Sequence, residues 1–155
     1  MQTMTIEARM TNPALLTADV LPALQSAHKA ARKSGLAPEV AYLVQLRASQ
    51  INGCSVCAEM HARELKESGA PEEKIWAVGA WRESVRFTAA ERAALALTEC
   101  VTRLADRPDP VPDEVYDEAA RHFDTEQLSG LVLEIALINV WNRLNVATRQ
   151  PSGSY

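Results

Sequence analysis

The sequence predicts an all-α fold, a bundle of about six to seven helices in a single domain. Alanine and leucine are abundant, glycine occurs only six times in 155 residues, and no β-branched run alternates strictly with polar residues. The composition favours helices, and the missing alternation argues against half-buried strands. A chain of this length can bury a substantial core without disulfide support, so we expect 1–155 to form one domain.

Residues 1–18 come before the first clear helical pattern. We expect them to form a flexible segment or one that contacts another subunit. The first predicted helix covers 21–34, with Pro22 in its first turn, where a missing N–H group costs nothing. Gly35 follows directly and is expected to end this helix.

The next two predicted helices are separated by a sharp turn. One begins near Pro38 and places apolar residues along a helical stripe up to Asn52-Gly53. This pair accepts positive φ angles and breaks helices, so the chain should turn there. A second helical pattern starts immediately after the turn and stops at Gly69.

Three signals organise the middle of the chain. A short helix opened by a proline is predicted over 71–81. Thr88 and Glu91 have the spacing of a capping box, which predicts a helix start before "RAALALTECVTRLA". The stretch 106–114 contains three prolines and four acidic residues and is therefore expected to be a connector.

Two helices should complete the bundle. One is predicted over 113–123, and Asp124 with Gln127 then caps the last and longest one, "TEQLSGLVLEIALINVWNRLNVATR". The middle of that helix is apolar nearly all round. We expect it to be buried on most sides, against other helices or a second subunit, and so predict a homo-oligomer.

Charge and hydropathy argue against several classes of partner. The chain has 16 Lys and Arg against 20 Asp and Glu, a net charge of −4, and no basic run that could follow a phosphate backbone. A nucleic-acid partner is therefore not expected. No stretch approaches 18 uncharged apolar residues, and the amino terminus lacks the pattern of a secretion signal. We expect a cytoplasmic protein without a membrane partner.

The stretch "SQINGCSVCAEMHARE" places Cys54, Cys57 and His61 within eight positions. The turn before it puts both cysteines in the first turn of a helix, where unpaired N–H groups and the helix dipole stabilise a thiolate. Residues three apart share a helix face, so the two sulfurs can form a disulfide. His61 follows Cys57 by four residues and can take its proton or pair with the thiolate.

Three interpretations of this cluster are open: packing, a zinc site and thiol redox chemistry. A close cysteine pair in a reducing compartment is typical of catalysis or metal binding. Zinc takes such ligands, but only three are present, and neither His28 nor His122 has ligand spacing of its own, so no metal is predicted. Redox chemistry needs only an activated thiolate, a resolving thiol and a base, and we favour it.

The string "LRASQINGCSVCAEMHARE" resembles the core motif of the carboxymuconolactone decarboxylase and alkylhydroperoxidase (AhpD-like) family. Looser similarity extends from about Pro38 to Arg149. The resemblance implies an all-helical fold, association through large helical interfaces, and reduction of hydroperoxides by the C-x-x-C pair. The catalytic residues that it implies here are Cys54, Cys57 and His61.

The implied reaction is a thiol peroxidase cycle. Cys57 would attack a hydroperoxide and become a sulfenic acid, with which Cys54 would condense. An external dithiol, lipoyl or thioredoxin-like, would reduce the disulfide, because nothing in the chain indicates a nucleotide or flavin cofactor. The helix dipole alone favours Cys54 as the attacking thiol, whereas the resemblance and the step to His61 favour Cys57. A carboxymuconolactone-decarboxylase-like lyase and a non-catalytic redox sensor stay open as alternatives.

The sequence departs from the peroxidase pattern at two positions. That pattern has a relay glutamate twelve positions before the first cysteine and a histidine directly before the second, where this chain has Tyr42 and Val56. Tyrosine can donate a hydrogen bond but is a poor base near neutral pH. Glu134, within the apolar stretch "LVLEIAL", could substitute in the relay or could pair with an arginine for structural reasons.

Overall fold

The computed structural model describes residues 4–153, and their regular structure is entirely helical. In chain order the elements are α1 (Pro13–Leu16), α2 (Val20–Ala31), η1 (Arg32–Ser34), α3 (Pro38–Asn52), α4 (Ser55–Glu67), α5 (Glu72–Ala77), η2 (Val78–Glu83), α6 (Ala89–Thr102), η3 (Leu104–Asp106), α7 (Asp113–His122) and α8 (Thr125–Thr148), where η marks a 3-10 helix. The all-α prediction is confirmed. The helix beyond the expected six or seven is the one-turn α1.

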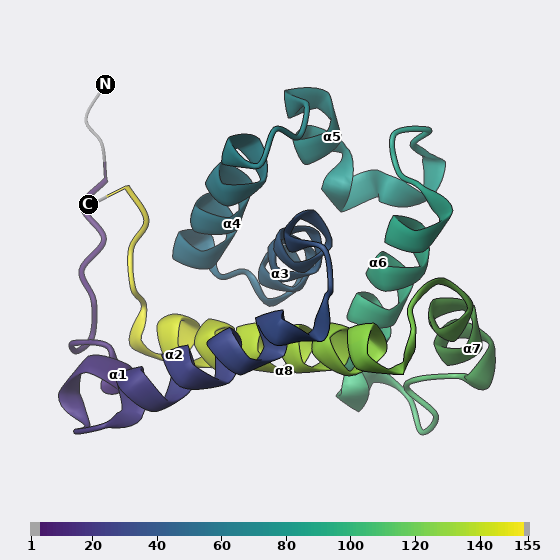
Figure 1. Ribbon diagram of the computed structural model, residues 1–155. Helices are drawn as coiled ribbons and strands as arrows, with labels where there is room; N and C mark the ends of the chain where they lie inside the picture. Colours follow the sequence, from purple (N-terminus) through teal and green to yellow (C-terminus); the bar gives the residue numbers. More distant parts are fainter. Residues whose placement is uncertain (1–3, 154–155) are drawn as a thin grey trace.

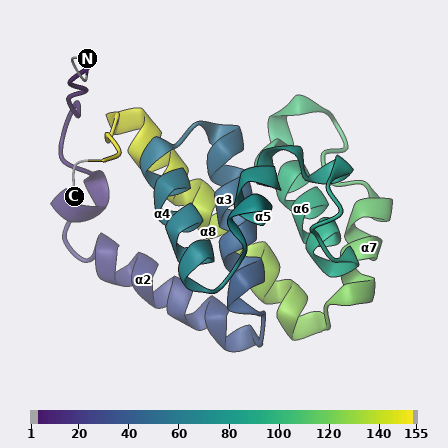
Figure 2. The same cartoon turned by 90° about the horizontal axis from the view of Figure 1, so that it is seen from above.

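Helix α3 lies at the centre of the bundle. Figure 1 looks nearly along its axis, with α4, α5 and α6 around it and α8 beneath it. Seen from above, α4, α3 and α6 lie in a row across the long α8 (Figure 2). Buried side chains occur on all sides of α3, so the single apolar stripe in its sequence understates its burial. The central position brings α4 and α8, which carry most of the candidate site, against the same helix.

The apolar core has two main parts that share α3. One part joins α3 to α6, α7 and α8, with Val44, Leu97 and Ile135 nearly or fully buried. The other joins α3 to α4, α6 and η2, with Leu43, Leu65 and Trp81. A third, smaller cluster contains the two cysteines of the motif, as described below. The motif is therefore buried inside the bundle, but in a cluster separate from the two main parts of the core.

Several predicted helix ends are confirmed by the caps that form them. Thr88 and Glu91 form a reciprocal capping box at the start of α6, and Asp124 and Gln127 form another at the start of α8. The short helix expected over 71–81 is interrupted, because α5 gives way to η2, in which Ala80 has a φ of −128° and a ψ of 37°. The break turns the chain so that Trp81 enters the core.

Helix α8 is buried on fewer sides within one chain than the apolar composition of its middle suggests. It is buried along one face, which includes Leu131 and Ile138, whereas Leu133 and Val140 are 47 % and 39 % exposed. The apolar composition around the helix therefore does not reflect burial on most sides within one chain. Within one chain, burial on all sides is a property of α3, and burial of the outer face of α8 against a second subunit stays a prediction.

Helix α2 and η1 pack closely against α8. A Cβ atom placed on Gly130 of α8 would lie 2.0 Å from Ser34 Oγ and 3.1 Å from the Ala31 carbonyl oxygen. Only a residue without a side chain allows this approach, although glycine weakens a helix interior. The contact holds α2 alongside the middle of α8.

A buried carboxylate ties η2 to the core. Glu99 of α6 accepts hydrogen bonds from Trp81 Nε1 at 2.9 Å, Arg82 at 2.6 Å and Arg47 Nε at 2.9 Å. Burial acts to raise the pKa of Glu99, but the hydrogen bonds from Trp81, Arg82 and Arg47 outweigh it and keep the pKa below its ordinary value. The carboxylate thus stays charged and holds three elements together.

Both ends of the described chain lie on one side of the molecule (Figure 1). The Arg9 amide donates a hydrogen bond to the Thr148 carbonyl at 2.8 Å, and Gln150 Nε2 donates to the Met10 carbonyl at 2.8 Å. Of the expected segment 1–18, residues 1–3 lie outside the described part, and a subunit contact by this segment stays a prediction. Within residues 4–153, no helix is long and apolar enough to cross a membrane.

Candidate functional site

The candidate site is built on the turn between α3 and α4. Gly53 ends α3 with a φ of 67°, and Cys54 follows in extended conformation as the N-cap residue of α4. The amide of Asn52 fixes this turn, because Nδ2 donates to the side-chain oxygens of Asn139 and Asn142 on α8 at 2.9 Å each. The glycine is required here because residues with side chains rarely adopt this left-handed conformation.

The two cysteines are joined in a disulfide at the start of α4. Cys57 lies in the first turn as predicted, but Cys54 lies one position earlier, at the cap. There its sulfur accepts a hydrogen bond from the Cys57 amide at 3.4 Å. Their Cα atoms are 5.4 Å apart and both residues are buried, with exposures of 2 % and 1 %. The disulfide thus closes a short loop within one helix start and joins no distant parts of the chain.

His61 lies one helical turn after Cys57 and is buried. Its Nδ1 atom is 2.7 Å from Glu64 Oε2, and its Nε2 atom has no hydrogen-bond partner among the described residues. A carboxylate accepts hydrogen bonds, so Nδ1 carries the proton in this contact. In the neutral ring Nε2 is then an uncommitted base.

A cavity of about 610 Å³ is lined by residues of α2, η1, α3, α4 and α8, and we call it the Cys57 cavity. Cys57 and His61 of α4, His28 of α2, and Trp141 and Asn145 of α8 line it. The rest of the lining is apolar at Leu21, Val56, Met60 and Ile138, and polar or charged at Gln25, Arg32, Gln45 and Glu64. Such a cavity, in which polar groups stand among apolar ones, suits a small organic molecule.

A hydrogen-bonded network joins α2, α3 and α8 at the wall of this cavity. His28 Nδ1 is 3.0 Å from Glu134 Oε2, and Trp141 Nε1 donates to His28 Nε2 at 3.0 Å. Because the indole only donates, His28 Nε2 accepts and its proton is on Nδ1, facing the carboxylate. Gln45 Nε2 donates to the same oxygen of Glu134 at 2.8 Å. Both ring nitrogens of His28 are therefore occupied.

Glu134 has features of both roles considered for it, a group in a proton relay and the partner of an arginine. It is 1 % exposed and bonded to His28, which lines the Cys57 cavity, while Arg32 Nε lies 3.8 Å from its other oxygen. That other oxygen has no hydrogen-bond partner among the described residues. Glu134 itself is not among the residues that line the cavity, so it reaches the cavity only through its partners.

The two positions that depart from the peroxidase pattern have different surroundings. Val56 lines the Cys57 cavity and supplies only an apolar surface. Tyr42 is not among the residues that line the Cys57 cavity. Its ring packs against Arg32, whose guanidinium carbon is 5.3 Å from the ring centre. Neither residue supplies a base to the cavity.

Asn145 is the site residue that the sequence reasoning missed. Its Nδ2 atom donates to Cys57 Sγ at 3.2 Å, and its Oδ1 atom accepts a hydrogen bond from Asn12 Nδ2 at 2.6 Å. The available signal was a polar series in an apolar helix, since Asn139, Asn142 and Asn145 recur every three residues on one face of α8.

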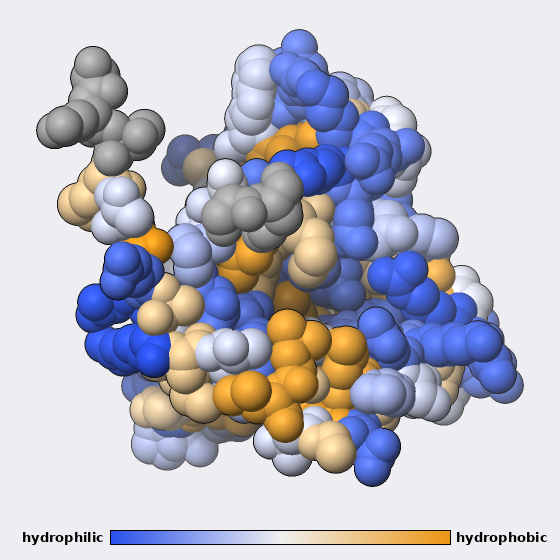
Figure 3. Space-filling model, turned by 90° about the vertical axis from the view of Figure 1, so that its left-hand side faces the viewer, coloured by the Kyte–Doolittle hydropathy of each residue, from blue (hydrophilic) through white to orange (hydrophobic). Residues whose placement is uncertain are grey.

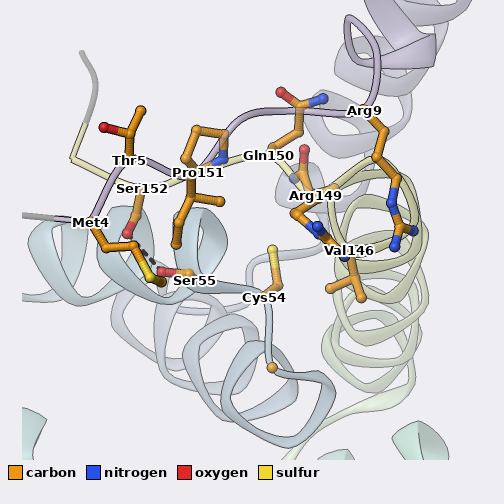
Figure 4. A pocket seen from close by; sticks show the side chains of 13 residues that line it. Met4, Thr5, Arg9, Cys54, Ser55, Val146, Arg149, Gln150, Pro151 and Ser152 are labelled. Carbon is orange, nitrogen blue, oxygen red and sulfur yellow. Dashed lines mark hydrogen bonds between the residues drawn. The ribbon is translucent and has the colours of Figure 1, made fainter.

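A second cavity lies on the other side of the disulfide, and we call it the Cys54 cavity. It has a volume of about 680 Å³ and is lined by Cys54, Asn145, and residues of both chain ends, among them Arg9 and Arg149. Figure 4 shows the Cys54 sulfur directed toward the space between Ser55, Pro151 and Gln150. Asn145 lines both cavities, whereas each cysteine lines only one.

No group of three His, Cys, Asp or Glu side chains within residues 4–153 is arranged to hold a metal ion.

A protein-family model, described as the carboxymuconolactone decarboxylase family, matches residues 18–99. The matched part includes α2, α3 and α4 and therefore the whole cysteine motif.

Two bacterial relatives are similar in sequence. The uncharacterized protein YdfG of Bacillus subtilis (strain 168) is 40 % identical over 105 residues, which cover 68 % of this chain and 70 % of YdfG. The uncharacterized protein YnjA of Escherichia coli (strain K12) is 32 % identical over 121 residues, which cover 78 % of this chain and 65 % of YnjA.

Two solved structures share the fold. A protein of unknown function from Agrobacterium tumefaciens, described as a "Putative Antioxidant Defence Protein AhpD", has a TM-score of 0.88 and 32 % identity, covering 96 % of this chain and 100 % of that one. The debrominase Bmp8, in a complex with 2,3,4-tribromopyrrole, has a TM-score of 0.77 and 22 % identity, covering 90 % of this chain and 73 % of that one. The second likeness concerns the fold alone.

Proposed function

The chain belongs to the carboxymuconolactone decarboxylase family, and on this premise we propose that it is a thiol-dependent reductase of alkyl hydroperoxides. The observation that carries the proposal is the position of Cys57 and His61 on one wall of the Cys57 cavity, with Cys54 bonded to Cys57 behind them. The pair supplies two electrons, and the cavity can receive a small organic molecule.

Cys57 is the attacking thiol in this proposal. It lines the cavity, whereas Cys54 does not, and Asn145 donates a hydrogen bond to its sulfur. A hydrogen bond to the sulfur favours the thiolate, which is the reactive form. The first-turn N–H groups of α4 act in the same direction.

The first half of the cycle consumes the hydroperoxide. His61 Nε2 takes the proton of the Cys57 thiol, and the thiolate attacks the terminal peroxide oxygen. A sulfur–oxygen bond forms and the oxygen–oxygen bond breaks, so Cys57 becomes a sulfenic acid. The leaving alkoxide takes the proton from His61 and departs as an alcohol.

The second half restores the thiols. The Cys54 sulfur attacks the Cys57 sulfenic acid, the disulfide forms, and water leaves with the Cys54 proton. An external dithiol then reduces the disulfide and supplies the two electrons that the hydroperoxide received. We place this cycle in the cytoplasm, where a reducing supply of thiols is available.

His28 and Glu134 hold the wall of the cavity in this proposal and do not move the reacting proton. His28 has both ring nitrogens in hydrogen bonds, to Glu134 and to Trp141, so neither is available to the Cys57 thiol. Of the two histidines that line the cavity, His61 is thus the one whose Nε2 atom can accept the thiol proton.

We also propose a homo-oligomer that uses the outer face of α8. Val132, Leu133 and Val140 are exposed on this helix by 36 %, 47 % and 39 %, and an apolar surface of this kind is typical of a subunit contact. Light scattering on the purified protein tests the proposal. A monomer at micromolar concentration would contradict it.

The test of function supplies an organic hydroperoxide and dihydrolipoamide, and compares the wild type with Cys54→Ser, Cys57→Ser and Cys100→Ser. Cys100 is a free cysteine outside both cavities and serves as the matched control. We expect turnover in the wild type and the control, and a rate at the uncatalysed background in the other two. Equal, negligible rates in all four proteins would contradict the proposed peroxidase activity.

Trapping with a sulfenic-acid reagent identifies the attacking thiol. In a single exposure to hydroperoxide, Cys54→Ser should accumulate the adduct on Cys57, since no resolving thiol is present. Cys57→Ser should give none, and the reverse pattern would assign the attack to Cys54. Disulfide formation without turnover would indicate a redox sensor, and lactone decarboxylation by the serine variants would indicate a lyase.

A further inference from the structure

A series of three hydrogen bonds leads from the amino-terminal segment to the Cys57 sulfur. Asn12 is the N-cap residue of α1, and its Oδ1 atom accepts a hydrogen bond from the Ala14 amide at 2.9 Å. Its Nδ2 atom donates to Asn145 Oδ1 at 2.6 Å. Asn145 Nδ2 in turn donates to Cys57 Sγ at 3.2 Å. The two side-chain bonds span 133 and 88 positions of the chain.

The backbone amide at the start of this series fixes the direction of every bond in it. A backbone N–H group can only donate, so the end of the Asn12 side chain that meets Ala14 is its oxygen. The other end is then the NH2 group, which needs an oxygen of Asn145 opposite it. The NH2 group of Asn145 is left to face Cys57. The orientation of the Asn145 amide is therefore set by Asn12.

This orientation decides how Asn145 acts on a thiolate at Cys57. An N–H group directed at the sulfur stabilises its negative charge, whereas a carbonyl oxygen in the same place would repel that charge. The two ends of an amide are nearly equal in size, so hydrogen bonds select between them better than packing does. The bond from Asn12 thus has a consequence for chemistry as well as for the fold.

The segment before Asn12 is tied to the carboxyl-terminal end of α8. The Arg9 amide donates to the Thr148 carbonyl at 2.8 Å, and the Arg9 guanidinium donates to the Ala147 carbonyl at 3.1 Å. Both carbonyls belong to the last turn of α8, next to the turn that carries Asn145. These bonds hold Asn12 beside Asn145.

Helix α1 has little apolar burial to hold it in place. Figure 3 faces the side of the molecule that carries both ends of the described chain, where apolar side chains gather low on the face. In α1 itself Ala14 is buried, but Leu15 and Leu16 are exposed. The position of this segment therefore depends on polar contacts, of which the bond between Asn12 and Asn145 is one.

We propose that Asn12 is a positioning residue for the chemistry of Cys57, because it holds the Asn145 amide with an N–H group toward the sulfur. Asn12 is not among the described residues that line the Cys57 cavity, and it acts through Asn145. The inference rests on the proposed function in one respect, that the Cys57 thiolate is the reacting group.

The same orientation favours the reduced form of the cysteine pair. A thiolate carries a full negative charge and accepts a hydrogen bond more strongly than a disulfide sulfur does. The N–H group of Asn145 therefore stabilises the dithiol protein relative to the disulfide. Loss of the bond from Asn12 should make the thiolate harder to form and the disulfide harder to reduce.

The test measures how readily Cys57 ionises, in a Cys54→Ser background and without hydroperoxide. Alkylation of Cys57 is followed against pH by peptide mass spectrometry, and the midpoint of the profile is recorded. Asn12→Asp keeps an acceptor for the Ala14 amide but has no donor for Asn145. The amide of Asn145 should then turn its oxygen toward Cys57, and we expect the midpoint to rise by about one to two pH units.

Two further variants separate this effect from that of an added charge. Thr11→Asp is the matched control, since Thr11 is the exposed neighbour of Asn12 and receives the same charge while the series stays intact. Its midpoint should stay within about half a pH unit of the parent. Asn12→Ala removes the donor without adding charge and should raise the midpoint by about one pH unit. An equal rise in Thr11→Asp and Asn12→Asp would overturn the proposal.

A double-mutant cycle tests whether Asn12 acts through Asn145. Asn145→Ala should raise the midpoint by about one pH unit, and adding Asn12→Ala should raise it no further. Thermal unfolding of the same proteins records the separate cost of the lost cap of α1. A purely structural role for Asn12 would lower the melting temperature and leave the midpoint of the single variant unchanged. That result would overturn the proposal, and so would midpoint shifts that add in the double variant.

A second measurement uses the protein with both cysteines. At equilibrium with a glutathione buffer, Asn12→Asp should shift the ratio of disulfide to dithiol about tenfold toward the disulfide, and Thr11→Asp should change it less than about threefold. An unchanged ratio in Asn12→Asp would contradict the proposal. Because neither measurement uses hydroperoxide, a protein without peroxidase turnover that still shows these shifts would refute the proposed function and leave the role of Asn12 standing.

Discussion

Two histidines line the same cavity and are bonded in similar ways, yet they are equipped for different tasks. His61 and His28 each direct Nδ1 toward a glutamate, Glu64 at 2.7 Å and Glu134 at 3.0 Å. They differ at Nε2, which has no partner in His61 and accepts a hydrogen bond from Trp141 in His28. A carboxylate partner at Nδ1 is therefore not sufficient for a histidine to act as a base. The Nε2 atom must also be without a hydrogen-bond donor, as it is in His61.

The substitution His61→Asn should have the largest effect. It removes the proposed base, and we expect the single-turnover oxidation of Cys57 by hydroperoxide to slow by about a hundredfold or more. Stopped-flow fluorescence or quenched alkylation measures this rate. A rate within about threefold of the wild type would show that the Cys57 thiolate forms without His61.

The substitution Glu64→Gln should have the next largest effect. The carboxylate fixes the proton on Nδ1 of His61, and an amide can donate as well as accept at this position, so the ring can adopt the other tautomer. We expect the same rate to fall by about tenfold and the shape of its pH profile to change. An unchanged pH profile with a lower melting temperature would assign Glu64 a structural role only.

The substitution His28→Asn should affect stability more than rate. It leaves the Trp141 N–H without its acceptor and removes one of the two hydrogen bonds to Glu134 Oε2, which should lower the free energy of unfolding by about 2 kcal/mol. The rate of Cys57 oxidation should stay within about fivefold of the wild type. Urea unfolding together with the single-turnover rate measures both. A hundredfold loss of rate at unchanged stability would make His28 the base.

The substitution Trp141→Phe should have the smallest effect. It keeps an aromatic wall and removes only the hydrogen bond to His28, so we expect about 1 kcal/mol less stability. The single-turnover rate should stay within about twofold of the wild type. A gain of rate in this variant would indicate that His28, freed at Nε2, can act as a base.

Local signals predicted most of the fold. The turn at Asn52-Gly53 and the two capping boxes depend on residues within four positions of one another, so the sequence displays them directly. The interruption at Ala80 and the different burial of α3 and α8 depend on packing among distant helices. Periodicity could not distinguish an apolar face that packs within the chain from one that stays exposed.

The candidate site likewise has a part that local spacing predicts and a part that depends on contacts between distant helices. Cys54, Cys57 and His61 come from one helix start, and their spacing alone brings them together. His28 meets Glu134 across 106 positions, and Asn145 meets Cys57 across 88. These contacts depend on how α2 and α8 pack beside α4, and no spacing in the sequence contains that information.

Gly130 fixes the spacing between α2 and α8, the helices that carry His28 and Trp141 on the wall of the Cys57 cavity. Because α2 touches the backbone of α8 at this residue, the distance between the two helices is fixed at its minimum, and His28 is held beside Trp141. A single methyl group at Gly130 would wedge the helices apart and widen the Cys57 cavity from its far wall. The disulfide and His61, which are carried by α4, would keep their mutual geometry. In the proposed function, the size of the substrate would thus depend on α2 and α8, and the reactivity of the thiol on α4.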